Sequence, residues 1–350
     1  MLVGADYLCD RSDMSSDPLC DALAVADARA VFSGGFSAGG PWALRLRGPD
    51  RLKVNAVVRG NCLLVREDSG ETLRLTEGDV VVSDGAKPYV LCSEPGLEPL
   101  GSGQVPLDPG TRMGRIGTGE DVVCLAGHID LSRDRGDLLR GALPELIHVR
   151  GDSPAAPRLR WLVEQLLDEM TRGRAGAEFA ADHLAQLIFV EVLRICLRER
   201  EGLPTGWLRA LADERLAPAL QLMHSDPDRP WSLEELARAS TMSRTSFAVH
   251  FRQAVGVPPL TYLLGWRMSL AARALRQDAT PVAELARSVG YTSESAFSNA
   301  FKRVMGVAPR HYRDAARAAV IADARGLAGR ELANAESGDP AALGGVMIAG

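Results

Sequence analysis

Hydrophobic and polar residues follow two different patterns along this chain of 350 residues. Between residues 30 and 130, short apolar runs such as RLKVNAVV and DVVVSD are separated by Gly, Asp and Pro, which is typical of β-strands joined by turns. Beyond residue 156 the apolar residues recur at helical spacing. The pattern predicts a β-sandwich or small barrel followed by helices, an α+β organisation. Residues 96–119, rich in Gly, Pro and Ser, are predicted to form a long loop.

The helical part begins with two helices, predicted over residues 156–170 and 177–201. The second is apolar around much of its circumference, as expected when a helix packs both on its own domain and on a partner. The predicted divisions of the chain are a flexible N-terminus (1–16), a β domain (17–150), a helical segment (151–212), an all-α domain (213–313) and a disordered tail rich in Ala and Gly (314–350).

Two stretches of the all-α domain repeat each other. SRTSFAVHF begins at Ser243 and SESAFSNAF begins at Ser293, and each lies within a longer copy, 233–262 and 282–312. Each copy predicts a helix-turn-helix, in which a short first helix is followed by a tight turn and by a second helix with the serine as its N-cap. The Phe pair at i and i+4 pins one face of the second helix to the first. A glycine, Gly256 or Gly306, ends it.

The opposite face of each second helix is predicted to stay exposed. It carries short polar side chains, methyl groups and cations, which suit phosphates, base edges and thymine methyls in a major groove. The candidate DNA-binding residues are Ser243, Arg244, Thr245, Ala248, Val249 and Arg252 in the first copy, and Glu294, Ser295, Ser298, Asn299 and Lys302 in the second. Ala248 and Val249 offer no hydrogen bonds, so the first helix is expected to recognise DNA by methyl contact and shape.

The two copies are joined by a predicted helix over residues 259–277. At about 1.5 Å per residue it is a rod of roughly 28 Å, long enough to hold two recognition helices about one DNA turn apart. A duplicated helical bundle without DNA binding is the alternative. Two copies with matched Phe, Gly, Pro and Tyr residues favour DNA binding.

Charge and composition favour some classes of function and argue against others. The net charge is −5, but residues 213–313 hold 13 Lys and Arg against nine Asp and Glu, a weak indication of nucleic-acid binding. No run of 18 apolar residues predicts a membrane helix, and the acidic N-terminus argues against a secretory signal and for the cytoplasm. The sequence contains no nucleophile elbow or paired-carboxylate pattern, so we expect neither an enzyme nor a cofactor.

Residues 213–313 resemble the AraC/XylS-type DNA-binding domain. The resemblance is carried by the LA…S…F…F…G–P–Y pattern, by WRMSLAARAL in the joining helix, and by ELARSVGYTSESAFSNAFKRVMGVAPRHYR. It implies a transcription regulator whose two recognition helices enter successive major-groove segments of double-stranded promoter DNA. It also implies a homodimer paired through the helices after the β domain, and contact with RNA polymerase if the chain is an activator.

Residues 17–150 resemble the cupin-type sensor domain found in one branch of that family, chiefly through TEGDVVVSDGAKPYVL. The resemblance implies a β-barrel that senses a small molecule or chemical stress. Asn55 and Tyr89 stand where metal-binding cupins have ligands, and His128 alone cannot hold a metal, so no metal site is expected. Candidate ligand-binding residues are Trp42, Asn55 and Tyr89.

Two other functions remain open at this point. Cys62 and Cys92 fall on strands predicted to be neighbours, so a regulator that senses oxidation through these cysteines, without a bound ligand, is the first alternative. The absence of CxxC pairs makes buried, inert thiols the simpler reading of the six cysteines. The second alternative is a metal-dependent cupin enzyme fused to a DNA-binding domain.

Overall fold

The computed structural model describes residues 17–46, 51–132, 136–200, 202–277 and 280–318. The chain divides into two compact units. The first holds the residues up to Ser225 together with Trp231–Tyr262, and the second holds Asp226–Pro230 and the residues from Leu263 onward. The predicted flexible N-terminus, 1–16, lies outside the described residues. So does the predicted tail from residue 319, whereas residues 314–318 are helical.

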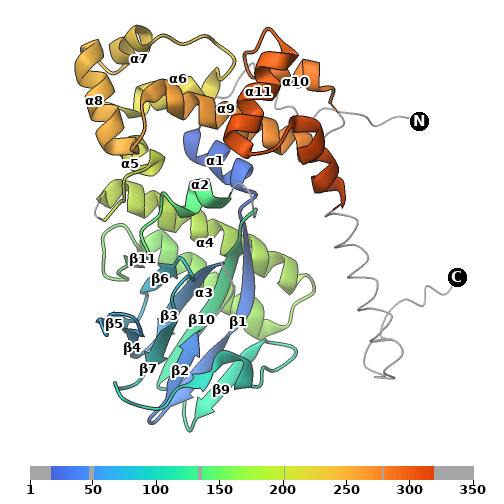
Figure 1. Cartoon of the computed structure of the whole chain (residues 1–350). Helices are drawn as coiled ribbons and strands as arrows, with labels where there is room; N and C mark the ends of the chain where they lie inside the picture. The colour runs from blue at the N-terminus through green and yellow to red at the C-terminus, as the bar shows by residue number, and fades with distance from the viewer. Residues whose placement is uncertain (1–16, 47–50, 133–135, 201, 278–279, 319–350) are drawn as a thin grey trace, which may run out of the picture. The chain divides into compact units, whose positions relative to one another are not determined.

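Two β-sheets form the core of the first unit (Figure 1). The six-stranded sheet runs in the order β11 (Leu146–Val149), β6 (Val80–Ser83), β3 (Leu52–Arg59), β10 (Val122–Asp130), β1 (Arg29–Gly39), β9 (Met113–Gly117). The five-stranded sheet runs in the order β5 (Thr72–Thr76), β4 (Asn61–Arg66), β7 (Tyr89–Cys92), β2 (Ala43–Leu46), β8 (Leu100–Gly101). Strands alternate their side chains between two faces, so the inward faces of both sheets supply one apolar core. Phe36, Leu64, Leu91 and Cys124 lie in it, each almost fully buried.

The predicted long loop over 96–119 contains regular structure that the sequence pattern did not reveal. It holds β8, the 3-10 turn η1 (Ser102–Gln104) and β9, and β9 pairs in parallel with β1 from Gly35↔Met113 to Gly39↔Gly117. The loop prediction was therefore wrong for this part.

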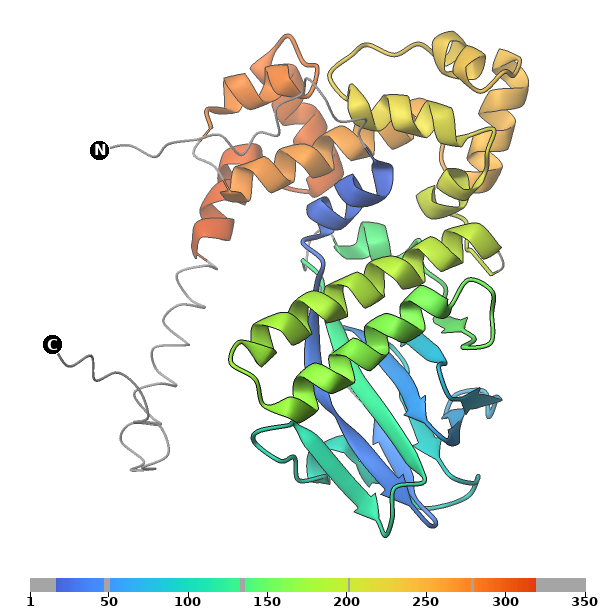
Figure 2. The ribbon, with the colours of Figure 1, turned by 180° about the vertical axis from the view of Figure 1, so that it is seen from behind.

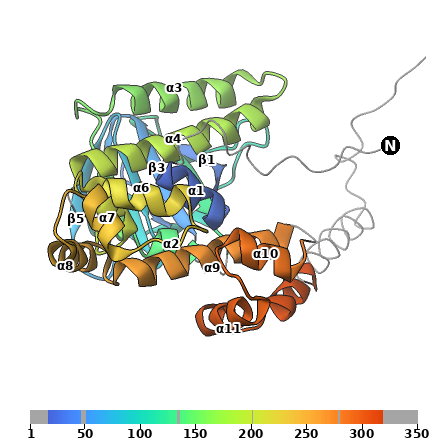
Figure 3. The same cartoon turned by 90° about the horizontal axis from the view of Figure 1, so that it is seen from above.

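Helices cover the outer face of the six-stranded sheet. α3 (Pro157–Arg172) and α4 (Ala177–Glu199) run side by side over it, as Figures 2 and 3 show. The side chains of α4 also hydrogen-bond to the sheet, because Ala30 N donates to Gln186 Oε1 at 2.8 Å and Phe32 N donates to Asp182 Oδ1 at 3.1 Å. Both predicted helices are confirmed to within two residues at each end.

Short helices make up the rest of the described chain. In the first unit these are α1 (Pro18–Ala26), α2 (Gly136–Arg140), α5 (Trp207–Ala212), α6 (Ala217–Ser225), α7 (Leu233–Ala239) and α8 (Arg244–Val255). α9 (Pro259–Gln277) begins in the first unit and continues into the second, followed by α10 (Val282–Ser288), α11 (Glu294–Met305) and a helical stretch over 309–318. The predicted joining helix over 259–277 is confirmed residue for residue. The α+β fold class, with a cupin-like barrel followed by helices, is confirmed as well.

Candidate nucleic-acid interface and sensor cavity

The first helical hairpin, α7 and α8, is defined by its caps. Ser232 and Glu235 form a capping box at the start of α7, in which Glu235 N donates to Ser232 Oγ at 3.2 Å and Ser232 N donates to Glu235 Oε2 at 2.9 Å. Ser243 is the N-cap of α8, as predicted, and accepts a hydrogen bond from Ser246 N at 3.2 Å. Gly256 ends α8 at a φ of 90°, a conformation that glycine adopts without strain.

Aromatic rings hold α8 in place. Phe247 and Phe251 are fully buried, with ring centroids 5.6 Å apart. Tyr262, at the start of α9, meets Phe251 edge-on with a centroid distance of 5.8 Å. Such pairs add about 0.5–1.5 kcal/mol beyond the area that they bury. The predicted Phe pair is therefore the core of this hairpin.

The second hairpin, α10 and α11, repeats this arrangement. Ser293 accepts from Ala296 N at 3.3 Å, and the buried Phe297 and Phe301 lie 5.7 Å apart with Tyr312 5.5 Å from Phe301. Gly290, in the turn, has a φ of 84°, and a Cβ there would lie 2.4 Å from the backbone oxygen of Asp228. The sequence repeat is thus a structural repeat.

The exposed faces of α8 and α11 carry nearly all of the predicted DNA-binding residues. Ala248 and Ser298 are half-buried, and the exposed ones are Ser243, Arg244, Thr245, Val249, Arg252, Glu294, Ser295, Asn299 and Lys302. Val249 has 53% of its surface exposed, so its methyl groups lie on the open face of α8.

Other exposed polar residues on these helices were not among the predicted ones. Ser246 and Gln253 lie on α8, and Arg303 lies on α11. The i and i+4 spacing of the buried Phe residues predicts that these three side chains are exposed as well. Arg310 also lies beside this surface, 3.5 Å from Glu294. This exposed ion pair contributes little stability, but it offsets the carboxylate on a helix that we expect to face phosphates.

A cavity of about 180 Å³ opens within the barrel. Its polar lining includes Asn55 of β3 and Tyr89 of β7, both predicted from the sequence, and also Lys53, which was not predicted. Asn55 Nδ2 donates a hydrogen bond to Tyr89 Oη. Burial raises the pKa of Tyr89 to about 12, so its hydroxyl keeps its proton at neutral pH. Trp42 does not line this cavity and packs edge-on against Phe36 in the core, with centroids 5.3 Å apart.

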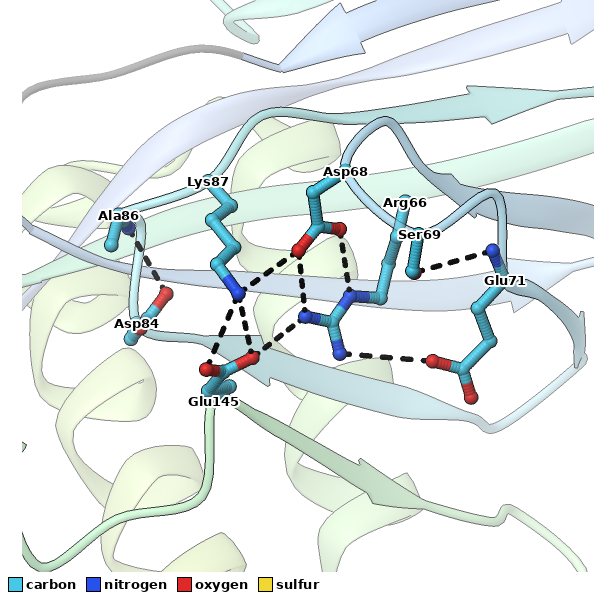
Figure 4. A network of polar contacts seen from close by, with 8 residues as sticks. All are labelled: Arg66, Asp68, Ser69, Glu71, Asp84, Ala86, Lys87 and Glu145. Carbon is cyan, nitrogen blue, oxygen red and sulfur yellow. Dashed lines mark hydrogen bonds and ion pairs between the residues drawn. The ribbon is translucent and has the colours of Figure 1, made fainter.

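Ion pairs connect the chain segments that lead into β7 and β11 (Figure 4). Arg66 lies 2.7 Å from Glu145 and 3.3 Å from Asp68, and Lys87 lies 2.9 Å from Asp68 and 3.2 Å from Glu145. Hydrogen bonds from Lys87 and Arg66 hold the pKa of the Asp68 carboxyl well below its usual range. The network connects the turns after β4 and β6 to the chain entering β11, and it lies close to solvent, so we assign it a structural role.

The predicted pair of redox cysteines does not form a pair in the structure. Leu63 is the register partner of Cys92, so Cys62 points to the opposite face of the sheet from Cys92. Cys62 accordingly lies in the core between the sheets, and Cys92 packs on the outer face with Ala43 and Val90. Burial also raises the pKa of Cys92, which disfavours the reactive thiolate. The redox alternative is therefore not supported.

Histidine and carboxylate positions in the described part of the chain do not build a metal centre. No group of three or more His, Cys, Asp or Glu side chains with metal-binding geometry occurs among the described residues. His128 instead contacts Ser33 Oγ through Nδ1 at 2.7 Å and Arg51 through Nε2 at 3.0 Å. Over the same residues, none of the helices is both long and apolar enough to cross a membrane.

Comparison with known proteins agrees with both halves of this description. Residues 17–198 match the cupin family and residues 236–315 match a helix-turn-helix domain family. A putative AraC-like transcription regulator of Streptomyces antibioticus is 38% identical over 297 residues, 85% of this chain and 98% of that protein. The HTH-type transcriptional regulator AlkR of Acinetobacter baylyi is 32% identical over 286 residues, 78% of this chain and 91% of that protein. Among solved structures, the DNA-binding domain of AdpA in complex with a target DNA is 31% identical over 30% of this chain and 95% of that chain, with a TM-score of 0.29.

A cupin domain followed by two helix-turn-helix hairpins defines a DNA-binding transcription regulator. The chain belongs to the family of AraC-like transcription regulators, as its motifs predicted.

Proposed function

We propose that a small molecule bound in the barrel cavity controls how this regulator binds promoter DNA. The observation that carries the proposal is a buried polar group without a partner. Asn55 is 4% exposed, and its Oδ1 has no hydrogen-bond partner among the described residues. Leaving such an acceptor unpaired costs about 1–3 kcal/mol, which a ligand with a hydrogen-bond donor would recover.

The first helix, α1, supplies a path from the sensor domain to the first hairpin. His224 of α6 is buried, with Nδ1 3.5 Å from Asp21 Oδ2 of α1 and Nε2 2.8 Å from Tyr262 Oη. Tyr262 in turn packs on Phe251 of α8. A ligand that binds two arrangements of these helices with different affinity would shift the balance between them. We infer that signalling follows this contact.

We infer that the exposed faces of α8 and α11 contact the DNA, with Arg244 and Asn299 as the principal base-reading residues. Arginine pairs in bidentate fashion with guanine, and asparagine with adenine. The other predicted residues on these faces are expected to contact phosphates or thymine methyls. A regulator of promoter DNA in a bacterium would act in the cytoplasm.

Dimerisation is proposed to use the outer faces of α3 and α4. Phe179 is 72% exposed, and Trp161 and Leu187 are exposed on the same helix pair. We expect Phe179→Glu to turn a dimer into a monomer and to weaken DNA binding, because pairing doubles the number of DNA contacts. Light scattering after size exclusion measures the mass, with Leu100→Glu, an exposed leucine on β8, as the matched control. A monomeric parent, or a variant that stays dimeric, would contradict the proposal.

The control by a ligand is tested with Asn55→Leu. Chromatin immunoprecipitation with sequencing first identifies the bound promoters, and a reporter on one of them then measures the response to the inducing condition. We expect Asn55→Leu to abolish the response while the purified variant binds the same DNA with unchanged affinity. Asn61→Leu, at an exposed asparagine on β4, should respond like the parent. A full response from Asn55→Leu would show that the cavity is not the sensor.

A further inference from the structure

Part of the cavity lining is polar. Asn55 and Tyr89 meet there, and because Asn55 Nδ2 is used on Tyr89 Oη, Asn55 Oδ1 is the free group. An amide oxygen only accepts hydrogen bonds. An occupant that brings a hydroxyl or an N–H group to this part of the cavity would supply the donor that Asn55 Oδ1 lacks among the described residues.

The second polar group is a cation on the same strand face. Lys53 precedes Asn55 by two residues on β3, so both side chains point to the cavity side of the sheet, about 7 Å apart along the strand. Within the described part of the chain the side chain of Lys53 makes no hydrogen bond or ion pair, and burial lowers its pKa. The nearby Asp130 carboxylate already pairs with Arg51 at 2.9 Å. An anionic group would supply the partner that Lys53 lacks.

The remaining lining is mostly apolar and sets the size of the occupant. Its apolar side chains are Phe36, Leu44, Leu46, Val105, Leu107 and Ala126, and Ser33, Ser102 and glycines on β1 and β10 complete it. The volume is about 180 Å³. An apolar cavity of about 150 Å³ accommodates benzene. The space between the two polar groups therefore fits a single ring or a short chain.

Resting on the proposed sensor function, we propose that the effector is a small hydroxy- or amino-substituted acid. Its anionic group pairs with Lys53, its hydroxyl or N–H donates to Asn55 Oδ1, and its apolar body fills the space between them. Apolar ligands without these groups, and acids without the donor, would leave a buried polar atom unpaired and bind less well.

Isothermal titration calorimetry of the full chain tests this with matched probes. The acids 4-hydroxybenzoate, which is rigid, and 6-hydroxyhexanoate, which is flexible, both carry the anion and the donor. The probe 4-fluorobenzoate lacks the donor, and 4-hydroxybenzamide lacks the charge. We expect at least one hydroxy acid to bind, and each matched probe that lacks a group to bind about 10-fold more weakly or worse. Failure of both hydroxy acids to bind, or equal binding of all probes, would overturn the proposal.

Variants provide a second test on the same ligands. Lys53→Met should remove the preference for 4-hydroxybenzoate over 4-hydroxybenzamide. Asn55→Leu should remove the preference for 4-hydroxybenzoate over 4-fluorobenzoate. Arg74→Met, at an exposed basic residue on β5 outside the cavity, should leave both preferences intact. If both variants fold and keep these preferences, Lys53 and Asn55 do not bind the effector. If a variant does not fold, the binding of the four probes to the parent chain tests the proposal.

The outcome separates this inference from the function on which it rests. If no hydroxy acid binds but the promoter response still requires Asn55, the effector belongs to another chemical class and only the present inference fails. If the promoter response is also independent of Asn55, the proposed sensor function fails with it.

Discussion

Phe251→Ala is expected to unfold the first hairpin while the β-sheets of the same unit remain folded. The ring is fully buried between Phe247 and Tyr262, so its removal leaves a cavity in a small core. Truncation of a buried Phe costs about 3–5 kcal/mol, comparable to the whole stability of a small helical unit. Amide hydrogen exchange measures this directly, because it reports the opening free energy of each helix separately.

We expect the amide hydrogens of α7 and α8 to lose their protection from exchange, whereas those of β3 and β10 stay protected. Val249→Ala, on the same helix but with 53% of the residue exposed, is the matched control and should leave protection unchanged. Equal protection of α8 in Phe251→Ala and in the parent would mean that the aromatic pair does not hold the hairpin.

The second large effect is expected from Arg244→Ala and Asn299→Ala on cognate DNA. Each side chain is exposed near the start or middle of its helix, without a structural role that its loss would disturb. A bidentate base contact contributes about 1–3 kcal/mol of discrimination, so each variant should lose roughly 5- to 100-fold in affinity for the cognate site. Binding to unrelated DNA should fall much less.

Fluorescence anisotropy at several salt concentrations distinguishes base contacts from phosphate contacts. A lost phosphate contact lowers the slope of log affinity against log salt by about one, whereas a lost base contact relaxes specificity at one position. Arg115→Ala and Asn61→Ala, at exposed positions on the barrel, serve as controls for charge and residue type. If both Arg244→Ala and Asn299→Ala bind cognate DNA like the parent, the assignment of the exposed faces is wrong.

The helical hairpins could be predicted in detail because their determinants are local. The N-cap serines, the i and i+4 Phe pairs and the terminal glycines act within one or two turns, so the sequence positions them directly. Even so, the ion pair between Glu294 and Arg310 was not predicted, because it joins α11 to the following helical stretch.

The barrel could be predicted only in outline because its determinants are distant pairings. β9, with the sequence MGRIG, is a strand because it lies beside β1, and its glycines obscure the alternation that marks other strands. The separation of Cys62 from Cys92 depends on the register between β4 and β7, which changes by a whole face with a shift of one residue.

The lining of the barrel cavity could likewise be predicted only in part. Asn55 and Tyr89 were selected from a family resemblance, and the structure adds Lys53 and places Trp42 in the core instead. No sequence signal distinguished Lys53 except its two-residue spacing from Asn55 on one strand. Whether an inward residue faces a cavity or a packed core depends on the side chains of the opposite sheet. Those side chains are distant in the sequence, so the sequence pattern does not reveal the contact.

Dimethyl sulfate protection of the cognate site tests the central claim most directly, because the reagent modifies guanine N7 in the major groove. Two helical hairpins that each present one helix to the duplex predict, for each bound protomer, protection in two major-groove segments about one helical turn apart. Arg244→Ala should relieve the protection of guanines in one segment. Asn299→Ala, by weakening the hold of the second recognition helix, should relieve the protection of guanines in the other segment. A single protected segment, or protection that both variants relieve at the same place, would contradict the account.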